Sequence, residues 1–133
     1  MTETARPTAT SPAHLMEVFA ARAAAGDLDG LIELYEPDAI FEPEFGVIAE
    51  GHAQLREALG EFLQLRPQIT YPDPPDVVTV GDIALVSNFW TMVGTAPDGS
   101  AVGQSGMSAD VCRRRPDGSW GVLIDQPRGE PTP

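Results

Sequence analysis

The stretch VGDIALVSNFWTMVGTAPDGSAVGQSGMSADVCRRRPDGSWGVLIDQ, residues 80–126, decides the fold class. Three turn signals divide it: Gly81-Asp82, Pro97-Asp98-Gly99 and Pro116-Asp117-Gly118. The extended runs between them predict strands at residues 83–94, 102–115 and 120–125. Turns this short join antiparallel neighbours, because a parallel pair needs a long crossover. We therefore expect an antiparallel meander in the C-terminal half.

Upstream of Pro67 the spacing of apolar residues is helical. It predicts helices at residues 12–25, 28–36 and 51–65, with short strands at 39–43 and 47–50. Residues 68–80 are extended, and three prolines confine them to an edge or a bulge. Helices followed by a meander are typical of the α+β class. The predicted fold is a cone-shaped domain, with about three N-terminal helices on a strongly curved antiparallel sheet and a concave pocket between them.

The composition describes one small acidic domain. The 133 residues carry a net charge of -12, and all eight cations are arginines. We expect one domain at residues 12–126 between loose tails at 1–11 and 127–133. Charge repulsion excludes nucleic acid as a partner, and no apolar run is long enough for a membrane helix. Cys112 is the single cysteine and no signal-peptide pattern is present, so we expect a cytoplasmic protein.

Glu42 is the first candidate for chemistry. The strand pleat places Ile40 and Glu42 on one face, so Glu42 points inward if Ile40 does. A carboxylate in an apolar pocket has a raised pKa and suits a general base. The alternative is a solvated Glu42 at the strand end beside Glu44.

Asp110 is the second candidate, because aspartate is depleted in the middle of strands. One interpretation is a pocket carboxylic acid that stays neutral and donates a hydrogen bond to a substrate oxygen. The other is a structural Asp110 that pairs with an arginine or a backbone N–H across the sheet.

A family resemblance rests on several short motifs. They are Ala25-Gly26-Asp27-Leu28-Asp29-Gly30, Leu34-Tyr35, Asp38-Ala39 and Glu42-Pro43. Together they resemble the N-terminal half of the ketosteroid isomerases and their SnoaL-like relatives in the nuclear transport factor 2-like superfamily. The ending, residues 113–120 with Ile124-Asp125-Gln126-Pro127, is similar to a bacterial SnoaL-like subgroup whose function is mostly unassigned.

The resemblance implies roles for individual residues. Glu42 stands where the isomerases have their base, and Asp110 where they have the protonated aspartate of the oxyanion hole. Phe19 occupies the position of the oxyanion tyrosine and has no hydroxyl. A complete oxyanion hole therefore needs Tyr35, Ser108 or Trp90 as a substitute, and with Phe19 these residues are the predicted pocket residues.

Two classes of function follow from these residues. The first is an acid-base enzyme of isomerase, cyclase or dehydratase type, which acts on a small hydrophobic carbonyl compound. The second is a protein that binds a hydrophobic ligand without turnover, and epoxide hydrolysis is a weaker third alternative. His14 and His52 are isolated in the sequence, so we expect no metal site and no cofactor.

The resemblance also implies a homodimer that covers the convex face of the sheet. Outward apolar residues such as Val86, Met92 or Val111 would form its interface. The periodicity of residues 83–94 leaves open which row of that strand lines the pocket.

Overall fold

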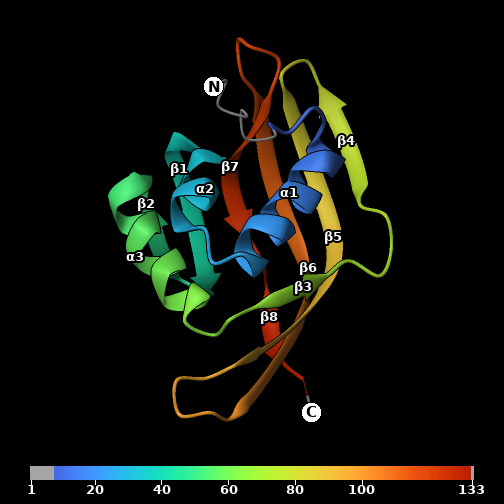
Figure 1. Ribbon diagram of the computed structural model, residues 1–133. Helices are drawn as coiled ribbons and strands as arrows, with labels where there is room; N and C mark the ends of the chain where they lie inside the picture. The colour runs from blue at the N-terminus through green and yellow to red at the C-terminus, as the bar shows by residue number, and fades with distance from the viewer. Residues whose placement is uncertain (1–7, 133) are drawn as a thin grey trace, which may run out of the picture.

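Three helices lie on one side of the sheet in the computed structural model, which describes residues 8–132 (Figure 1). They are α1 (Pro12–Ala24), α2 (Leu28–Glu33) and α3 (Gly51–Leu63). Ser11 caps α1 by accepting a hydrogen bond from the amide of His14, and Asp27 caps α2 by accepting one from the amide of Gly30. Helix α2 is shorter than the sequence predicts, because the chain turns into a strand at Tyr35.

Eight strands form the sheet. They are β1 (Tyr35–Glu44), β2 (Val47–Glu50), β3 (Gln68–Thr70), β4 (Asp76–Val80), β5 (Ile83–Thr95), β6 (Ala101–Arg114), β7 (Trp120–Gln126) and β8 (Gly129–Pro131). Their order is β2-β1-β7-β6-β5-β3, with β4 also paired to β5 and β8 to β6. The α+β fold with helices on a curved sheet is confirmed.

The pairing of β1 corrects one detail of the prediction. Strand β1 runs parallel to β7, so the sheet is mixed and not wholly antiparallel. The rule that short turns give antiparallel pairs holds for the β5–β6 and β6–β7 hairpins. It does not govern β1 and β7, because the intervening chain includes α3 and five strands and is long enough for a crossover.

The edge and the termini are built from interrupted segments. Strands β3 and β4 pair with opposite halves of β5, and the proline-containing segment lies between them. The predicted C-terminal tail is partly ordered, because β8 pairs with β6 and the amide of Thr132 donates to the carbonyl of Gly103 at 3.0 Å. Of the predicted N-terminal tail, residues 1–7 lie outside the described residues. Ala9 is buried, and its carbonyl accepts a hydrogen bond from the Trp120 amide.

The core lies between the helices and the inner face of the sheet. Alternate residues of β5 point inward, and Ala84, Val86 and Met92 have at most 1% of their surface exposed. Val86 and Met92 are therefore core residues and not the outward residues expected at a dimer interface. No helix among residues 8–132 is long and apolar enough to cross a membrane.

Candidate functional site

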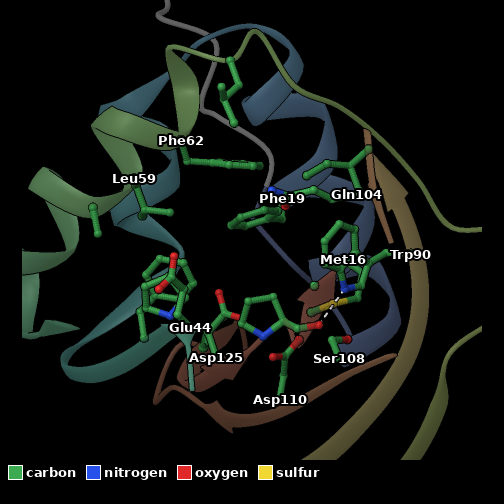
Figure 2. A pocket seen from close by; sticks show the side chains of 18 of the residues that line it. Met16, Phe19, Glu44, Leu59, Phe62, Trp90, Gln104, Ser108, Asp110 and Asp125 are labelled. Atoms are coloured by element: carbon green, nitrogen blue, oxygen red, sulfur yellow. Dashed lines mark hydrogen bonds between the residues drawn. The ribbon is translucent and has the colours of Figure 1, made fainter. Parts of the chain in front are cut away.

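A cavity of about 590 Å³ opens between the helices and the inner face of the sheet. Its helical wall is apolar and includes Phe19 of α1 and Leu59 and Phe62 of α3. Its sheet wall carries the carboxyl groups of Asp110 on β6 and Asp125 on β7. Figure 2 shows these carboxyl groups across the cavity from Leu59 and Phe62. An apolar chamber with a few polar groups on one wall has the character of a small-molecule site.

A β-bulge brings the two aspartates together. Cys112 pairs with Val122 across β6 and β7, but the next residue, Val111, pairs with Ile124, which leaves Leu123 as the extra residue. The shift places Asp125 directly opposite Asp110. Without the bulge, Ile124 would stand opposite Asp110 in place of Asp125, and the sheet wall would carry one aspartate instead of two.

Asp110 and Asp125, the carboxyl pair, share a proton. Burial, the negative charge of Asp125 and a hydrogen bond to Asp125 all raise the pKa of Asp110 well above its usual value. The amide of Gln126 donates to Oδ1 of Asp110 at 3.1 Å, which opposes this shift. Burial also raises the pKa of Asp125, although hydrogen bonds from Tyr35 and Asp110 oppose the rise. The interaction between the two carboxyl groups raises the pKa of Asp110 and lowers that of Asp125, which favours the proton on Asp110.

Tyr35 belongs to this network but does not line the cavity. Its hydroxyl donates to Oδ2 of Asp125 at 2.5 Å. The ring of Phe19 packs edge-on against Tyr35, with ring centres 6.3 Å apart and planes at 73°. Burial, with the charge of Asp125 next, raises the pKa of Tyr35 well above its usual value, so the phenol stays protonated. Phe19 and Tyr35 thus hold Asp125 in position.

Trp90 and Ser108 line the cavity as predicted, but their donors are used within the protein. The indole N–H of Trp90 donates to the carbonyl of Pro127 at 2.9 Å, and the hydroxyl of Ser108 donates to the carbonyl of Asn88 at 3.1 Å. With Tyr35 bound to Asp125, none of the three predicted substitutes has a donor left for a ligand.

Tyr71 supplies the donor that these residues lack. It follows β3 and lines the cavity, and its hydroxyl makes no hydrogen bond to another group among residues 8–132. Burial, with the charges of Asp110 and Asp125, raises its pKa, so the phenol is protonated and able to donate. Sequence reasoning missed Tyr71, because the prolines around it indicated only an irregular edge.

Glu42, the predicted base, does not line the cavity. In the middle of β1, Ala39 and Phe41 are buried whereas Ile40 and Glu42 are partly exposed, so the row of Ala39 and Phe41 points inward. Phe41 pairs with Asp125 across β1 and β7, which turns Glu42 to the opposite face of the strand. There Oε1 of Glu42 accepts a hydrogen bond from the Gln126 amide side chain at 3.3 Å.

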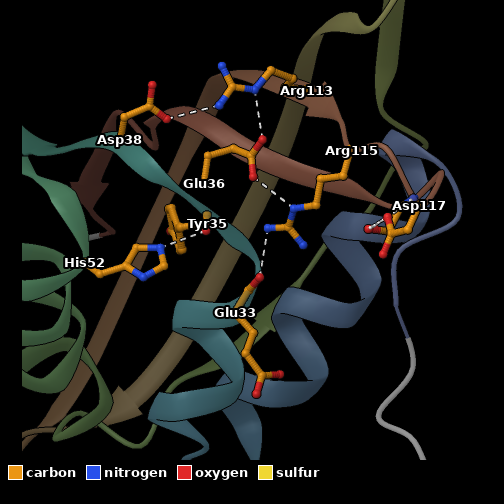
Figure 3. Close-up of polar contacts among 9 residues, drawn as sticks. Glu33, Tyr35, Glu36, Asp38, His52, Arg113, Arg115 and Asp117 are labelled. Atoms are coloured by element: carbon orange, nitrogen blue, oxygen red, sulfur yellow. Dashed lines mark hydrogen bonds and ion pairs between the residues drawn. The ribbon is translucent and has the colours of Figure 1, made fainter.

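The arginines of residues 113–115 form a separate polar cluster. Nε of Arg113 and Nε of Arg115 each donate to Glu36 at 2.9 Å, and Arg113 also pairs with Asp38 (Figure 3). Arg114 pairs with Asp82 at 2.6 Å. Asp110 therefore has no arginine beside it, and its partner across the sheet is a backbone N–H, as one interpretation of the sequence allowed. No three His, Cys, Asp or Glu side chains within the described part of the chain are grouped to hold a metal ion.

The family can be assigned at this point. Residues 16–120 match the model of the SnoaL-like domain, which covers most of the chain. The chain belongs to the SnoaL-like domain family. This assignment confirms the resemblance of the sequence motifs. Among curated proteins, none matches this chain.

Solved structures of the nuclear transport factor 2-like superfamily share this SnoaL-like fold. A superfamily member from Salmonella enterica serovar Typhimurium aligns with a TM-score of 0.77 at 16% identity, over 91% of this chain and 88% of that one. A candidate dehydratase of the same superfamily from Streptomyces avermitilis aligns at 0.73 and 19% identity, over 89% and 91%. A member with a cystatin-like fold from Novosphingobium aromaticivorans aligns at 0.68 and 19%, over 85% and 75%. Identities this low show a shared fold.

Proposed function

We propose that the protein binds a small hydrophobic carbonyl compound in the cavity and that Asp125 moves a proton on it. The observation that carries this proposal is the carboxyl pair, two facing carboxyl groups with raised pKa values on the sheet wall of a largely apolar cavity. A carboxylate with a raised pKa is a stronger base, and the surrounding apolar wall excludes competing water.

The two aspartates have different tasks in this reaction. Asp125 keeps part of its surface open to the cavity, whereas Asp110 is only 5% exposed. Asp125 removes a proton from the carbon next to the carbonyl, and the electron pair moves onto the carbonyl oxygen. Tyr71 donates a hydrogen bond to that oxygen, and Asp110 stabilises the carboxyl pair as its proton count changes. In an isomerase, the abstracted proton then returns to another carbon, and in a dehydratase it leaves with a hydroxyl group as water. In a cyclase, the deprotonated carbon bonds to a second carbonyl carbon of the substrate, and the oxygen of that carbonyl takes the proton. The three reaction types therefore share the first step.

The exchange of a carbon-bound proton tests this step without the natural substrate. 2-Tetralone is a small hydrophobic ketone whose acidic protons exchange with deuterium oxide, and proton NMR measures the rate. The wild-type protein should accelerate the exchange. Asp125→Asn should lose about 10²- to 10⁴-fold of that acceleration, the usual contribution of a positioned acid or base. Glu42→Gln is the matched control, since Glu42 lies on the other face, and should exchange as wild type does.

Binding without turnover is the alternative, and Phe19 favours it. The phenylalanine stands where the isomerases have a hydroxyl donor, and the donors of Tyr35, Ser108 and Trp90 serve the protein itself. In that case tetralone would bind, seen as a change in tryptophan fluorescence, and its exchange rate would stay at the uncatalysed value. Epoxide hydrolysis through an Asp-Arg-Asp set is disfavoured, because no arginine is among the described residues that line the cavity.

A second copy of this chain is the partner we propose for the outer face. Large apolar residues on three adjacent strands remain exposed there: Val78, Val80, Ile83, Leu85, Phe89, Val93 and Met107. Val78 pairs with Leu85 and Phe89 with Met107, so the residues form one continuous surface. Light scattering should give twice 14.2 kDa for the wild type and 14.2 kDa for Leu85→Glu.

The single thiol, Cys112, is buried, and a cytoplasmic location remains our proposal.

A further inference from the structure

The charged groups of the cavity wall all have the same sign. Asp110 and Asp125 lie on the sheet wall, and Glu44 of β1 and Glu61 of α3 are exposed residues of the same lining. Within residues 8–132, no arginine or histidine contributes to that lining. Because the whole chain also carries a net charge of -12, the electrostatic potential in the cavity attracts cations and repels anions.

The hydrogen-bonding groups of the sheet wall suit an ammonium group. An ammonium has three N–H donors and no acceptor. Asp125 uses Oδ2 for Tyr35 and has acceptor capacity left, and the Tyr71 hydroxyl oxygen makes no hydrogen bond within residues 8–132. Asp110 accepts from the Gln126 amide and becomes a further acceptor once its proton leaves. Two carboxylates and a phenol oxygen can therefore satisfy all three N–H groups of a primary amine.

The apolar part of the same ligand has a place as well. Phe19, Leu59 and Phe62 form the wall that faces the carboxyl pair (Figure 2). A hydrocarbon attached to the ammonium would lie against these side chains, and its transfer from water is favourable at about 25 cal/mol per Å².

We propose that the cavity selects its ligands by charge: it binds lipophilic primary amines, with the ammonium between Asp110 and Asp125, takes uncharged ligands less tightly and rejects carboxylates and phosphates. This inference rests on the cavity of the proposed function and names the ligand class that it favours. Amine binding leaves both carboxyl groups ionised, so the proton of Asp110 passes to the solvent.

Other titratable groups around the carboxyl pair do not take part in this exchange of protons. Tyr35 on β1 and Tyr71 after β3 stay neutral, because burial raises both pKa values. Burial, with the charges of Asp110 and Asp125, also raises the pKa of the Cys112 thiol to about 12. The released proton therefore reports on the carboxyl pair.

Three naphthalene derivatives of similar size test the proposal. Naphthylethylamine, naphthylethanol and naphthylacetate differ in charge but have the same ring system. Isothermal titration calorimetry at about pH 8, where the amine is protonated, should show the amine at least tenfold tighter than the alcohol. Naphthylacetate should bind at least tenfold more weakly than the alcohol. Titrations in buffers of different ionisation enthalpy should show up to about one proton released per amine and none per alcohol.

Two variants test whether the charge selection comes from the carboxyl pair. Asp125→Asn removes one carboxylate, and should weaken the amine so that the amine and the alcohol bind to within about threefold of each other. Glu42→Gln removes a charge of the same kind from the outer face and should leave the order of the three ligands unchanged. Circular dichroism establishes that both variants are folded.

The outcomes separate this inference from the proposed function. If the alcohol binds but the amine binds no more tightly, or if naphthylacetate binds as well as the alcohol, charge selection is wrong and the cavity of the proposed function stands. An amine that binds without proton release also contradicts the placement between the two carboxyl groups. If none of the three compounds binds, both proposals fail.

Discussion

Asp110 on the inner face of the sheet and Glu36 on its outer face are both nearly buried, with 5% of Asp110 and 8% of the Glu36 side chain exposed. Their surroundings differ in the charge of the nearest partner. Asp110 faces a second carboxyl group, and burial together with the charge of Asp125 raises its pKa. Burial opposes the ionisation of Glu36 too, but hydrogen bonds from Arg113 and Arg115 outweigh it and lower the pKa.

This difference separates a structural carboxylate from a reactive one. A buried carboxylate with two arginines is neutralised and fixed in place, and its proton is gone at neutral pH. A carboxyl group paired with another carboxyl group keeps a proton that it can exchange with a ligand. Burial alone does not distinguish the two cases. The charge of the nearest side chain distinguishes them.

Glu36→Gln should have the largest effect on stability. The variant leaves two arginines without their shared carboxylate, and because both are partly exposed we expect a loss of about 2 kcal/mol, below the full cost for a buried pair. The pKa of Glu36 is lowered by folding, so this stabilisation exists above the unfolded pKa of about 4.3 and is lost as the pH falls through the folded value. Urea unfolding at about pH 7 and about pH 3 measures the difference, and an equal loss at both pH values would contradict the ion-pair explanation.

Asp110→Asn should change the free energy of unfolding in the opposite direction to Glu36→Gln, and by a smaller amount. The amide keeps an acceptor for the Gln126 N–H and a donor toward Asp125, but carries no charge. Folding raises the pKa of Asp110, so its own contribution to stability is fully present below about pH 4 and is lost as the pH rises through the folded pKa. The variant should therefore match the wild type near pH 4 and exceed it by about 1 kcal/mol at about pH 8. A variant that is less stable at about pH 8 would show that Asp110 is ionised and well solvated.

The sequence predicted the fold well because its strongest signals are local. The turns at Pro97-Asp98-Gly99 and Pro116-Asp117-Gly118 and the capping residues Ser11 and Asp27 act over four or five residues. The parallel β1–β7 pair joins segments some eighty residues apart, and no local pattern specifies it.

The sequence predicted only part of the site, because local patterns identify some of its residues whereas the others depend on the register between strands. Asp110 is conspicuous in its own strand, and its place in the cavity follows from the alternation of β6. Asp125 reaches the same place only through the bulge at Leu123, which shifts the register by one residue. Glu42 was assigned to the inner face because Ile40 was expected to be buried, whereas Ala39 and Phe41 form the buried row. A single-residue choice of register thus decides which carboxyl groups face the cavity.

Glu42→Gln should change the free energy of unfolding least of the three variants. It compares a carboxylate on the outer face of the sheet with those on the inner face. Oε1 of Glu42 accepts a long hydrogen bond of 3.3 Å from the Gln126 side chain, and Oε2 accepts one of 3.3 Å from the Gly46 amide. The single carbonyl oxygen of a glutamine can keep only one of these two weak bonds. We expect a change within about 0.5 kcal/mol in the free energy of unfolding, as for an ordinary surface substitution. Tetralone exchange and the binding of all three naphthalene probes should also match the wild type. A loss of exchange in Glu42→Gln with normal exchange in Asp125→Asn would return the role of base to Glu42, and would mean that β1 turns its other face to the cavity when a ligand binds.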